Sequence, residues 1–181
     1  MMTVRAFLIA LLLLPGWALA QQSPPPAQQT TPPAPETLFG APLVDLAGKP
    51  VSLAQFRGQP LLINFWRWCG PCRTEIPQIV TEYDRAKIEK TSDAGVQVIG
   101  IALDDKPDAV RDFAKAYGID YPVLLLKDNG PDLLKQLGNP QAGLPYTLVV
   151  QRDGKIVGAK LGAMTREQIL AALKAAGEAP K

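Results

Sequence analysis

The sequence predicts an α/β domain in which a mixed β-sheet is covered by helices on both faces. Three observations carry this prediction. Short apolar runs, typical of strands buried on both sides, alternate with segments of helical period. A tight-hairpin signal, Asp153-Gly154, and a last helical segment follow the alternation. Cys69 and Cys72, the only cysteines among the 181 residues, lie where an apolar run passes into a helix.

Residues 1–20 have the pattern of a secretory signal peptide. Arg5 supplies the positive charge, an apolar run follows, and Ala18-Leu19-Ala20 is a small-residue cleavage site. A membrane-spanning helix needs about 20 apolar residues, so the run at 6–14 is too short. An uncleaved anchor stays the alternative and is the one membrane contact that we consider. We therefore expect a periplasmic protein that is soluble after cleavage.

Residues 21–37 are rich in proline and glutamine and have few apolar side chains. This composition predicts an extended, disordered linker, followed by one folded domain at 38–178. Without residues 1–20 the chain has 18 basic against 17 acidic side chains. That balance gives no electrostatic case for binding nucleic acid.

The elements of the domain are predicted in chain order. A small hairpin is expected first, with strands at 42–46 and 51–53 around Ala47-Gly48. Further strands are expected at 61–65, 96–103, 122–126, 147–151 and 155–159. Helices are expected at about 69–89, with Pro77 bending it, from Pro107 to Gly118, at 132–137, and from Thr165 to Gly177. Thr165 and Gln168 form a capping-box pattern.

Two thiols at this spacing can interconvert between a dithiol and a disulfide. Cys69 is expected at the helix N-terminus, where unpaired N–H groups and the helix dipole favour a thiolate. Such surroundings lower a thiol pKa from about 8.5 to about 7. Cys72 lies one turn further in, as suits a resolving thiol. An inert disulfide is the alternative. We expect no metal, because a zinc site needs four ligands and the chain has no His and no third Cys.

Residues 68–72, Trp-Cys-Gly-Pro-Cys, resemble the thioredoxin superfamily. With Asn-Phe-Trp at 64–66 and Arg-Thr-Glu-Ile-Pro at 73–77, the pattern is similar to the TlpA/ResA branch of extracytoplasmic thiol-disulfide oxidoreductases. The likeness covers about residues 38–176. It implies a thioredoxin-like fold with an N-terminal β-hairpin and an inserted strand and helix. It also implies protein-disulfide oxidoreductase activity through a Cys69–Cys72 disulfide, with no other cofactor.

The junction before Cys69 departs from the family pattern. The family usually has two residues between the two tryptophans, whereas here only Arg67 separates Trp66 from Trp68. The turn from strand to helix is therefore one residue short. Trp68 is expected to pack and also to offer clients a flat apolar docking surface.

Pro145 directly precedes a predicted strand. The resemblance implies a cis bond before it, facing the cysteines and presenting the backbone of Leu144 to an extended client peptide. An ordinary trans proline is the alternative that the sequence alone favours.

Glu75 follows Cys72 by three residues and has two interpretations. It is either an acid in the first helical turn, where the helix dipole favours negative charge, or a partly buried acid that exchanges protons with Cys72. Thioredoxins usually carry their acid on the preceding strand, where Asn64 stands here. ResA-like members carry a glutamate that matches Glu75.

The direction of electron flow is predicted from two features. Pro71 lacks an N–H that would stabilise a thiolate, and the chain has no histidine to add positive charge. Both favour a reductase. The resemblance implies client proteins with cysteines or disulfides, such as apocytochrome c or copper-site proteins, and a membrane thiol transporter as electron donor.

Three other functions stay open as alternatives. A peroxiredoxin has Thr or Ser three residues before its reactive cysteine, where Trp66 stands here. A copper chaperone of the related type usually has three residues between its cysteines and a distant His ligand. A redox-inactive binding module is the third, because the turn before Cys69 is shortened.

Overall fold

The computed structural model describes residues 34–89, 95–103, 106–126 and 128–180. The strands are β1 (Leu43–Val44), β2 (Pro50–Val51), β3 (Leu61–Trp66), β4 (Gln97–Ala102), β5 (Val123–Leu126), β6 (Tyr146–Val150) and β7 (Ile156–Leu161). The helices are α1 (Pro35–Phe39), α2 (Gly70–Glu89), α3 (Pro107–Ala116), α4 (Gly130–Gln136) and α5 (Arg166–Gly177), with a 3-10 helix η1 (Leu53–Phe56). The predicted signal peptide, residues 1–20, lies outside the described residues.

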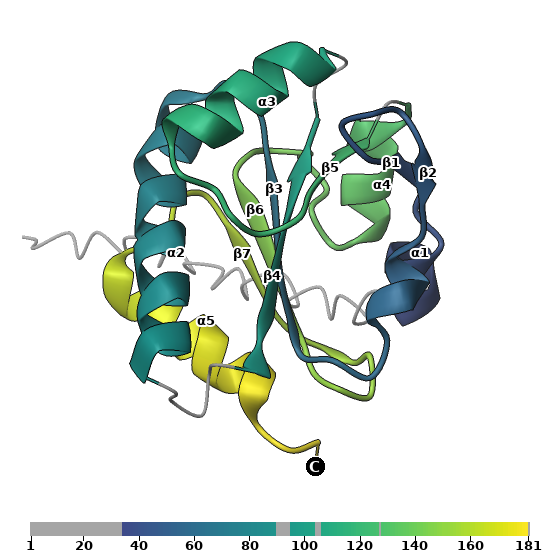
Figure 1. Cartoon of the computed structure of the whole chain (residues 1–181). Helices are drawn as coiled ribbons and strands as arrows, with labels where there is room; N and C mark the ends of the chain where they lie inside the picture. The colour runs from purple at the N-terminus through teal and green to yellow at the C-terminus, as the bar shows by residue number, and fades with distance from the viewer. Residues whose placement is uncertain (1–33, 90–94, 104–105, 127, 181) are drawn as a thin grey trace, which may run out of the picture.

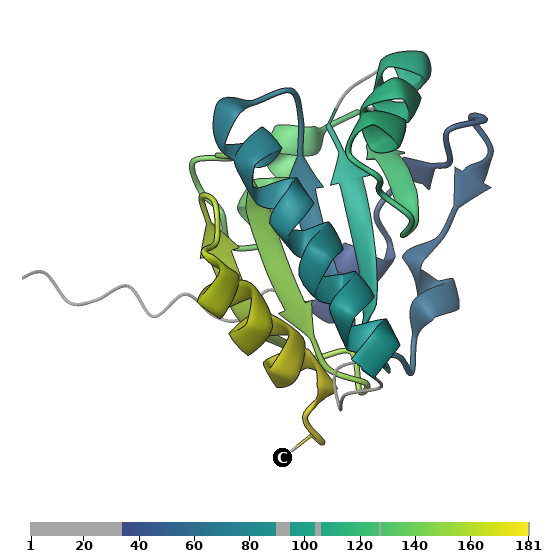
Figure 2. The ribbon, with the colours of Figure 1, turned by 60° about the vertical axis from the view of Figure 1, so that its left-hand side comes forward.

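The strands join into one mixed sheet. Within the described ranges it has seven strands in the order β2-β1-β5-β4-β3-β6-β7. Strands β3, β4 and β5 run parallel, and the remaining neighbours pair antiparallel. Figure 1 shows the sheet between two layers of helices, and in Figure 2 α2 and α5 lie side by side over one face. The predicted fold class is confirmed.

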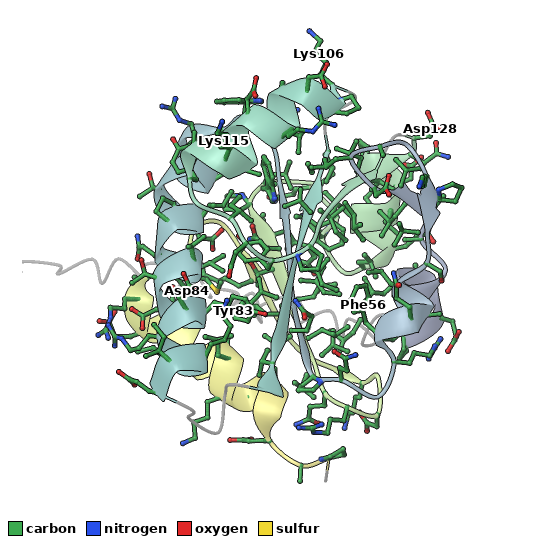
Figure 3. All side chains as sticks on the ribbon, viewed as in Figure 1. Phe56, Tyr83, Asp84, Lys106, Lys115 and Asp128 are labelled. Atoms are coloured by element: carbon green, nitrogen blue, oxygen red, sulfur yellow. A yellow bond between two sulfur atoms is a disulfide. The ribbon has the colours of Figure 1, made fainter. Side chains whose placement is uncertain are left out.

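The central strand β3 is buried at all six positions, as its apolar run predicts. Leu61, Ile63 and Phe65 point to the face that α1 and α4 cover. Leu62 and Trp66 point to the opposite face, toward α2, α3 and α5. Side chains fill both layers, and Tyr83 lies between α2 and the sheet (Figure 3). The sheet therefore has one core on each side, and β3 contributes to both.

Helices α2 and α5 agree with their predicted ends. Helix α2 is continuous through Pro77. Helix α5 begins with the predicted capping box, in which Gln168 N donates to Thr165 Oγ1 (3.4 Å) and Thr165 N donates to Gln168 Oε1 (3.0 Å). None of the helices in the described ranges combines the length and the apolar composition that a membrane span requires.

Several predicted boundaries differ from the structure; the first hairpin strand, for example, spans only Leu43–Val44 rather than 42–46, and α3 ends at Ala116 rather than at Gly118. The second hairpin strand ends at Val51, because Ser52 Oγ accepts from Ala54 N (3.2 Å) and caps η1, so the strand prediction for residues 52–53 is wrong. Helix α1 takes in residues 35–37, which were expected to belong to the linker, and it buries Leu38 and Phe39 in the core. Helix α4 begins two residues earlier than predicted, at Gly130.

Candidate redox site

The residue before α2 is Cys69, and its sulfur accepts a hydrogen bond from the helix. The backbone N–H of Cys72 donates to Cys69 Sγ at 3.2 Å. This is the bond that the oxygen of a capping serine or aspartate accepts at a helix start. The N–H of Arg73 donates to the Cys69 carbonyl at 3.0 Å. Cys69 Sγ therefore lies at the positive end of α2, where negative charge is stabilised.

The shortened junction between β3 and α2 is closed by a tight turn. Cys69 N donates to the Arg67 carbonyl at 2.7 Å, which makes a three-residue γ-turn centred on Trp68. The Trp66 carbonyl still accepts from Leu103 N at 2.8 Å. Strand β3 thus keeps its pairing to its last residue, and Trp66 stays fully buried. The pairing of β3 with β4 therefore continues to Trp66, and the shortened turn begins after it.

The two cysteines form a disulfide with a Cα–Cα separation of 5.2 Å. Their exposures differ. Cys72 is fully buried, whereas Cys69 is partly exposed. An incoming sulfur can therefore reach Cys69, and Cys72 is shielded by the first turn of α2.

The peptide bond between Leu144 and Pro145 is cis, as expected from the resemblance. Antiparallel pairing of β3 with β6 places Tyr146 opposite Phe65, so the start of β6 lies beside the end of β3. This brings the Leu144 carbonyl oxygen to 3.9 Å from Cys69 Sγ. The sheet topology thus brings together two segments that are 75 residues apart in the chain.

Trp68 rests on an aromatic cluster supplied by β3 and α3. Its ring packs edge-on against Phe113, with centroids 4.8 Å apart, and Trp66 stacks on Phe113 at 4.6 Å. Half of the Trp68 surface (50%) remains exposed next to Cys69. Tyr117 packs on Phe113 and accepts a hydrogen bond from Arg73 Nε at 3.2 Å. Helix α3 therefore supports an apolar surface beside the reactive sulfur.

Glu75 is fully buried and lies beyond the first turn of α2, so it does not fit the interpretation as a first-turn acid. Asn64 Nδ2 donates to Oε2 (3.0 Å), and Met164 N donates to Oε1 (2.9 Å). Burial raises the pKa of Glu75, while these hydrogen bonds and the charge of Lys160 oppose the rise. The result is a buried acid on α2 with a raised pKa, as the second interpretation requires.

Further buried polar groups surround Glu75. Asn64 Nδ2 also donates to Thr147 Oγ1 at 2.9 Å, which ties β3 to β6 beneath α2. Asn64 Oδ1, Trp66 Nε1 and Tyr121 OH are buried without a hydrogen-bond partner among the described residues. Burial, together with the charge of Glu75, raises the pKa of Tyr121. The acid thus lies in a polar region of an otherwise apolar layer.

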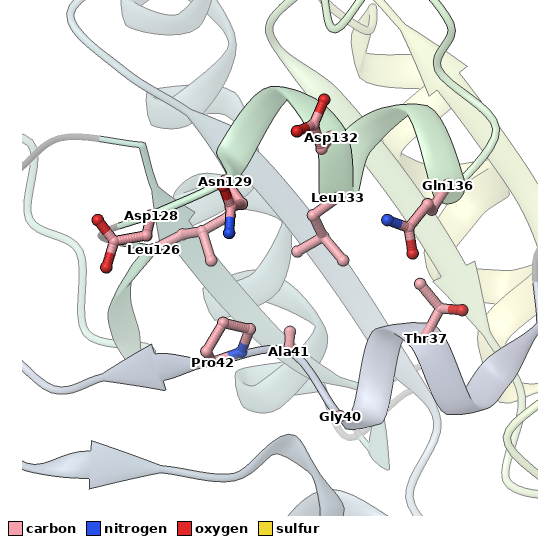
Figure 4. Close-up of a pocket in the computed structure, with 10 residues that line it drawn as sticks. All are labelled: Thr37, Gly40, Ala41, Pro42, Leu126, Asp128, Asn129, Asp132, Leu133 and Gln136. Carbon is pink, nitrogen blue, oxygen red and sulfur yellow. The ribbon is translucent and has the colours of Figure 1, made fainter.

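A cavity of about 480 Å³ lies elsewhere, between α1 and α4 (Figure 4). Leu133 and Gln136 of α4 face Ala41 and Thr37 across it. None of the predicted site residues lines it. The predicted redox residues lie instead around Cys69, which is partly exposed.

Two supporting residues were not found by sequence reasoning. Phe113 was not among the predicted site residues, yet its ring packs against Trp68. Asn139 was not singled out, and its buried amide binds the segment before Pro145. An asparagine between Gly138 and Pro140, close to a proline expected to be cis, is the signal that points to such a role.

Comparison with known proteins agrees with this geometry. The family model described as Redoxin matches residues 26–175, more than half of the chain. The chain belongs to the Redoxin family. Within it, this Redoxin protein is a thioredoxin-like thiol-disulfide oxidoreductase of the ResA type. It is 33% identical over 133 residues to the thiol-disulfide oxidoreductase ResA of Bacillus thuringiensis, covering 73% of this chain and 72% of that one.

Solved structures show the same relationship. The Redoxin protein is similar to a thioredoxin-family thiol:disulfide interchange protein from Chlorobium tepidum, with 29% identity and a TM-score of 0.60 over 76% of this chain and 95% of that one. It is also similar to StoA from Bacillus subtilis, with 26% identity and a TM-score of 0.54 over 72% of this chain and 95% of that one.

Proposed function

We propose that this Redoxin protein works outside the cytoplasm as a reductase of disulfides in client proteins. The observation that carries the proposal is the position of Cys69 Sγ. It is partly exposed at the start of α2, bonded to the buried Cys72, and 3.9 Å from the Leu144 carbonyl. The Cys69 sulfur is thus accessible to a client protein, and the Cys72 sulfur is buried behind it.

The first step is attack by Cys69 on the client disulfide. In the reduced protein, the start of α2 stabilises the Cys69 thiolate. The thiolate forms a bond to one client sulfur, and the client S–S bond breaks. The other client sulfur leaves as a thiolate and takes a proton from water. The product is a mixed disulfide between Cys69 and the client.

The second step releases the client. Cys72 gives its proton to Glu75, and the Cys72 thiolate attacks Cys69 Sγ. The Cys69–client bond breaks, the client sulfur leaves with the electron pair, and the Cys69–Cys72 disulfide forms. Glu75 lies one helical turn after Cys72 on α2. Its raised pKa makes the Glu75 carboxylate a stronger proton acceptor than an ordinary glutamate.

Client binding uses two neighbouring groups. The exposed face of Trp68 offers apolar contact beside the sulfur. The backbone of Leu144, held by the cis bond to Pro145, offers hydrogen bonds to an extended client segment. Trp68 would thus contact an apolar part of the client and Leu144 would bind its backbone, so neither contact requires one particular client side chain.

Sequence features support the proposed direction of electron flow and the proposed partners. Pro71 and the absence of histidine in the chain favour a reductant. After each cycle the protein carries a disulfide, so it needs two electrons from a donor, for which a membrane thiol transporter fits. The signal-peptide pattern at 1–20 supports a periplasmic location. Similarity to ResA supports clients with haem-site or copper-site cysteines.

Equilibration with glutathione tests the direction. We expect a midpoint potential near that of thioredoxin, about −270 mV. A midpoint near −120 mV, typical of a strong oxidant such as DsbA, would contradict the reductase proposal. Peroxide consumption without a thiol substrate, or tight Cu(I) binding by the reduced protein, would instead support the peroxiredoxin or copper-chaperone alternative.

A further inference from the structure

We propose that Asn139 is a positioning residue for this reaction, because it fixes the direction in which Leu144 presents its backbone to Cys69 and the client. The inference rests on the proposed docking of clients at Leu144. Asn139 lies six residues before Pro145 and has no direct contact with either cysteine among the hydrogen bonds of the described residues. It acts through the segment between them.

The side chain of Asn139 holds Gly143 by both of its backbone groups. Asn139 Nδ2 donates to the Gly143 carbonyl at 2.8 Å, and Gly143 N donates to Asn139 Oδ1 at 3.3 Å. The side-chain amide thus pairs with Gly143 as a neighbouring strand would. Asn139 is only 1% exposed, so these bonds form away from water, where an unpaired polar group is costly.

We call the two hydrogen bonds between the Asn139 side chain and Gly143 the clamp. The backbone of Asn139 connects this clamp to the rest of the fold. Its N–H donates to the Leu134 carbonyl of α4 at 2.9 Å, and its carbonyl accepts from Ala142 N at 2.9 Å. Ala142 has a φ of 49°, a left-handed conformation that is unfavourable for alanine. The hydrogen bonds around it hold the chain in this conformation. The loop before Gly143 therefore depends on Asn139 for its shape.

The other side of Leu144 is fixed independently. The Pro145 carbonyl accepts from Gly162 N at 2.8 Å, and Tyr146 OH donates to the Leu137 carbonyl at 2.6 Å. Leu144 is thus the single residue between Pro145, which is held by the residues that directly follow β7 and α4, and Gly143, which is held by Asn139. Loss of the clamp frees the Gly143–Leu144 peptide to rotate, while Pro145 stays in place.

This arrangement separates client binding from sulfur chemistry. A client that pairs with Leu144 needs the correct direction of its backbone groups, whereas a small disulfide needs only access to Cys69. Asn139→Ala should therefore raise the KM for insulin about tenfold, the worth of one well-placed hydrogen bond, with little change in kcat. The rate with hydroxyethyl disulfide should change less than about twofold. Both assays use dithiothreitol as the electron donor.

Asn139→Asp gives a readout that general loss of stability would not produce. The introduced carboxylate accepts from Gly143 N but repels the Gly143 carbonyl, so the clamp is half lost at neutral pH. Burial raises the pKa of such a carboxyl, and its protonated form can donate to the carbonyl again. The KM for insulin, relative to the wild-type value at the same pH, should therefore fall toward one as the pH is lowered to about 5.

Gln151→Ala is the matched control. Gln151 is also buried and its side-chain amide donates to the Ala175 carbonyl at 3.3 Å, at the far end of β6 from Pro145. It should leave the KM for insulin unchanged. If Asn139→Ala lowers kcat for insulin and the rate with hydroxyethyl disulfide equally, or leaves the KM unchanged, the inference is wrong.

Pro145→Ala distinguishes this failure from a failure of the proposed docking. An increased KM for insulin in Pro145→Ala, with no increase in Asn139→Ala, would overturn only the role of Asn139. An unchanged KM in both variants would overturn docking at Leu144 itself, and with it the inference.

Discussion

The two sulfurs of one disulfide lie in contrasting surroundings. Cys69 is partly exposed, at the positive end of α2, between Trp68 and the Leu144 carbonyl. Cys72 is fully buried on the first turn of the same helix, and Glu75 follows it in a polar region beneath α2. The contrast shows how residues at the start of one helix can have very different exposure. In the proposed function, the exposed Cys69 binds the client, and the buried Cys72 and Glu75 exchange a proton.

Replacing each sulfur in turn should give the largest effects. Cys69→Ser removes the attacking group, so insulin reduction should fall at least about 10³-fold. Cys72→Ser keeps the attack but removes the release, so a mixed disulfide with the client should accumulate. Non-reducing gels and mass spectrometry measure both. Trapping by Cys69→Ser in place of Cys72→Ser would reverse the assigned roles.

Removing the buried acid should slow release and spare attack. In Glu75→Gln, Cys72 loses its proton acceptor, so resolution of the mixed disulfide at pH 7 should slow about 10- to 100-fold. Rapid mixing of the reduced protein with a disulfide-containing peptide separates formation of the mixed disulfide from its decay. Equal slowing of both phases would show that Glu75 acts on both sulfurs and would remove the contrast between them.

The raised pKa of Glu75 also predicts how stability depends on pH. A carboxyl with a raised pKa binds its proton more tightly in the folded state, so the folded state holds more protons than the unfolded state between the two pKa values. The free energy of unfolding of the oxidised protein should therefore fall as the pH rises from about 4.3 through the raised pKa, and then level off.

Urea denaturation of Glu75→Gln against pH checks this prediction. In the variant, the free energy of unfolding should no longer decrease over this pH range, because glutamine does not titrate. Glu36→Gln, at an exposed carboxyl paired with Arg57, is the control and should keep the wild-type profile. An unchanged profile in Glu75→Gln would mean that Glu75 titrates as an ordinary carboxyl.

The smallest effect is expected at the docking surface. Trp68→Ala removes the exposed apolar face, so the KM for insulin should rise about fivefold. Trp68→Phe keeps an aromatic ring against Phe113, so its KM for insulin should be close to the wild-type value. Stability should change little in both, since half of the Trp68 surface is already in water. A KM in Trp68→Ala equal to that of the wild type would limit docking to the Leu144 backbone.

The sequence predicts the elements that depend on local pattern. The apolar run of β3, the stripe of α2 and the capping box of α5 carry their own signals, and all three are present. The position of Cys69 before a helix follows from the same reasoning. The cis bond at Pro145 needed the resemblance, because the isomer depends on contacts with a distant segment.

The remaining features depend on contacts between distant parts of the chain. Phe113 supports Trp68 only because α3 folds back over the end of β3. Residues 35–37 have the composition of a linker, yet they begin α1 because Leu38 and Phe39 enter the core. The predicted strand at 51–53 ends at Val51 because Ser52 caps η1. Local pattern does not encode which distant surface a residue meets.

Alkylation of the reduced protein by iodoacetamide, followed by mass spectrometry across a pH series, tests the difference between the two sulfurs most directly. The structure predicts that Cys69 is modified first, with a rate that rises through a pKa well below about 8.5, while Cys72 stays protected. Modification of Cys72 first, or of both cysteines at one rate, would contradict the account.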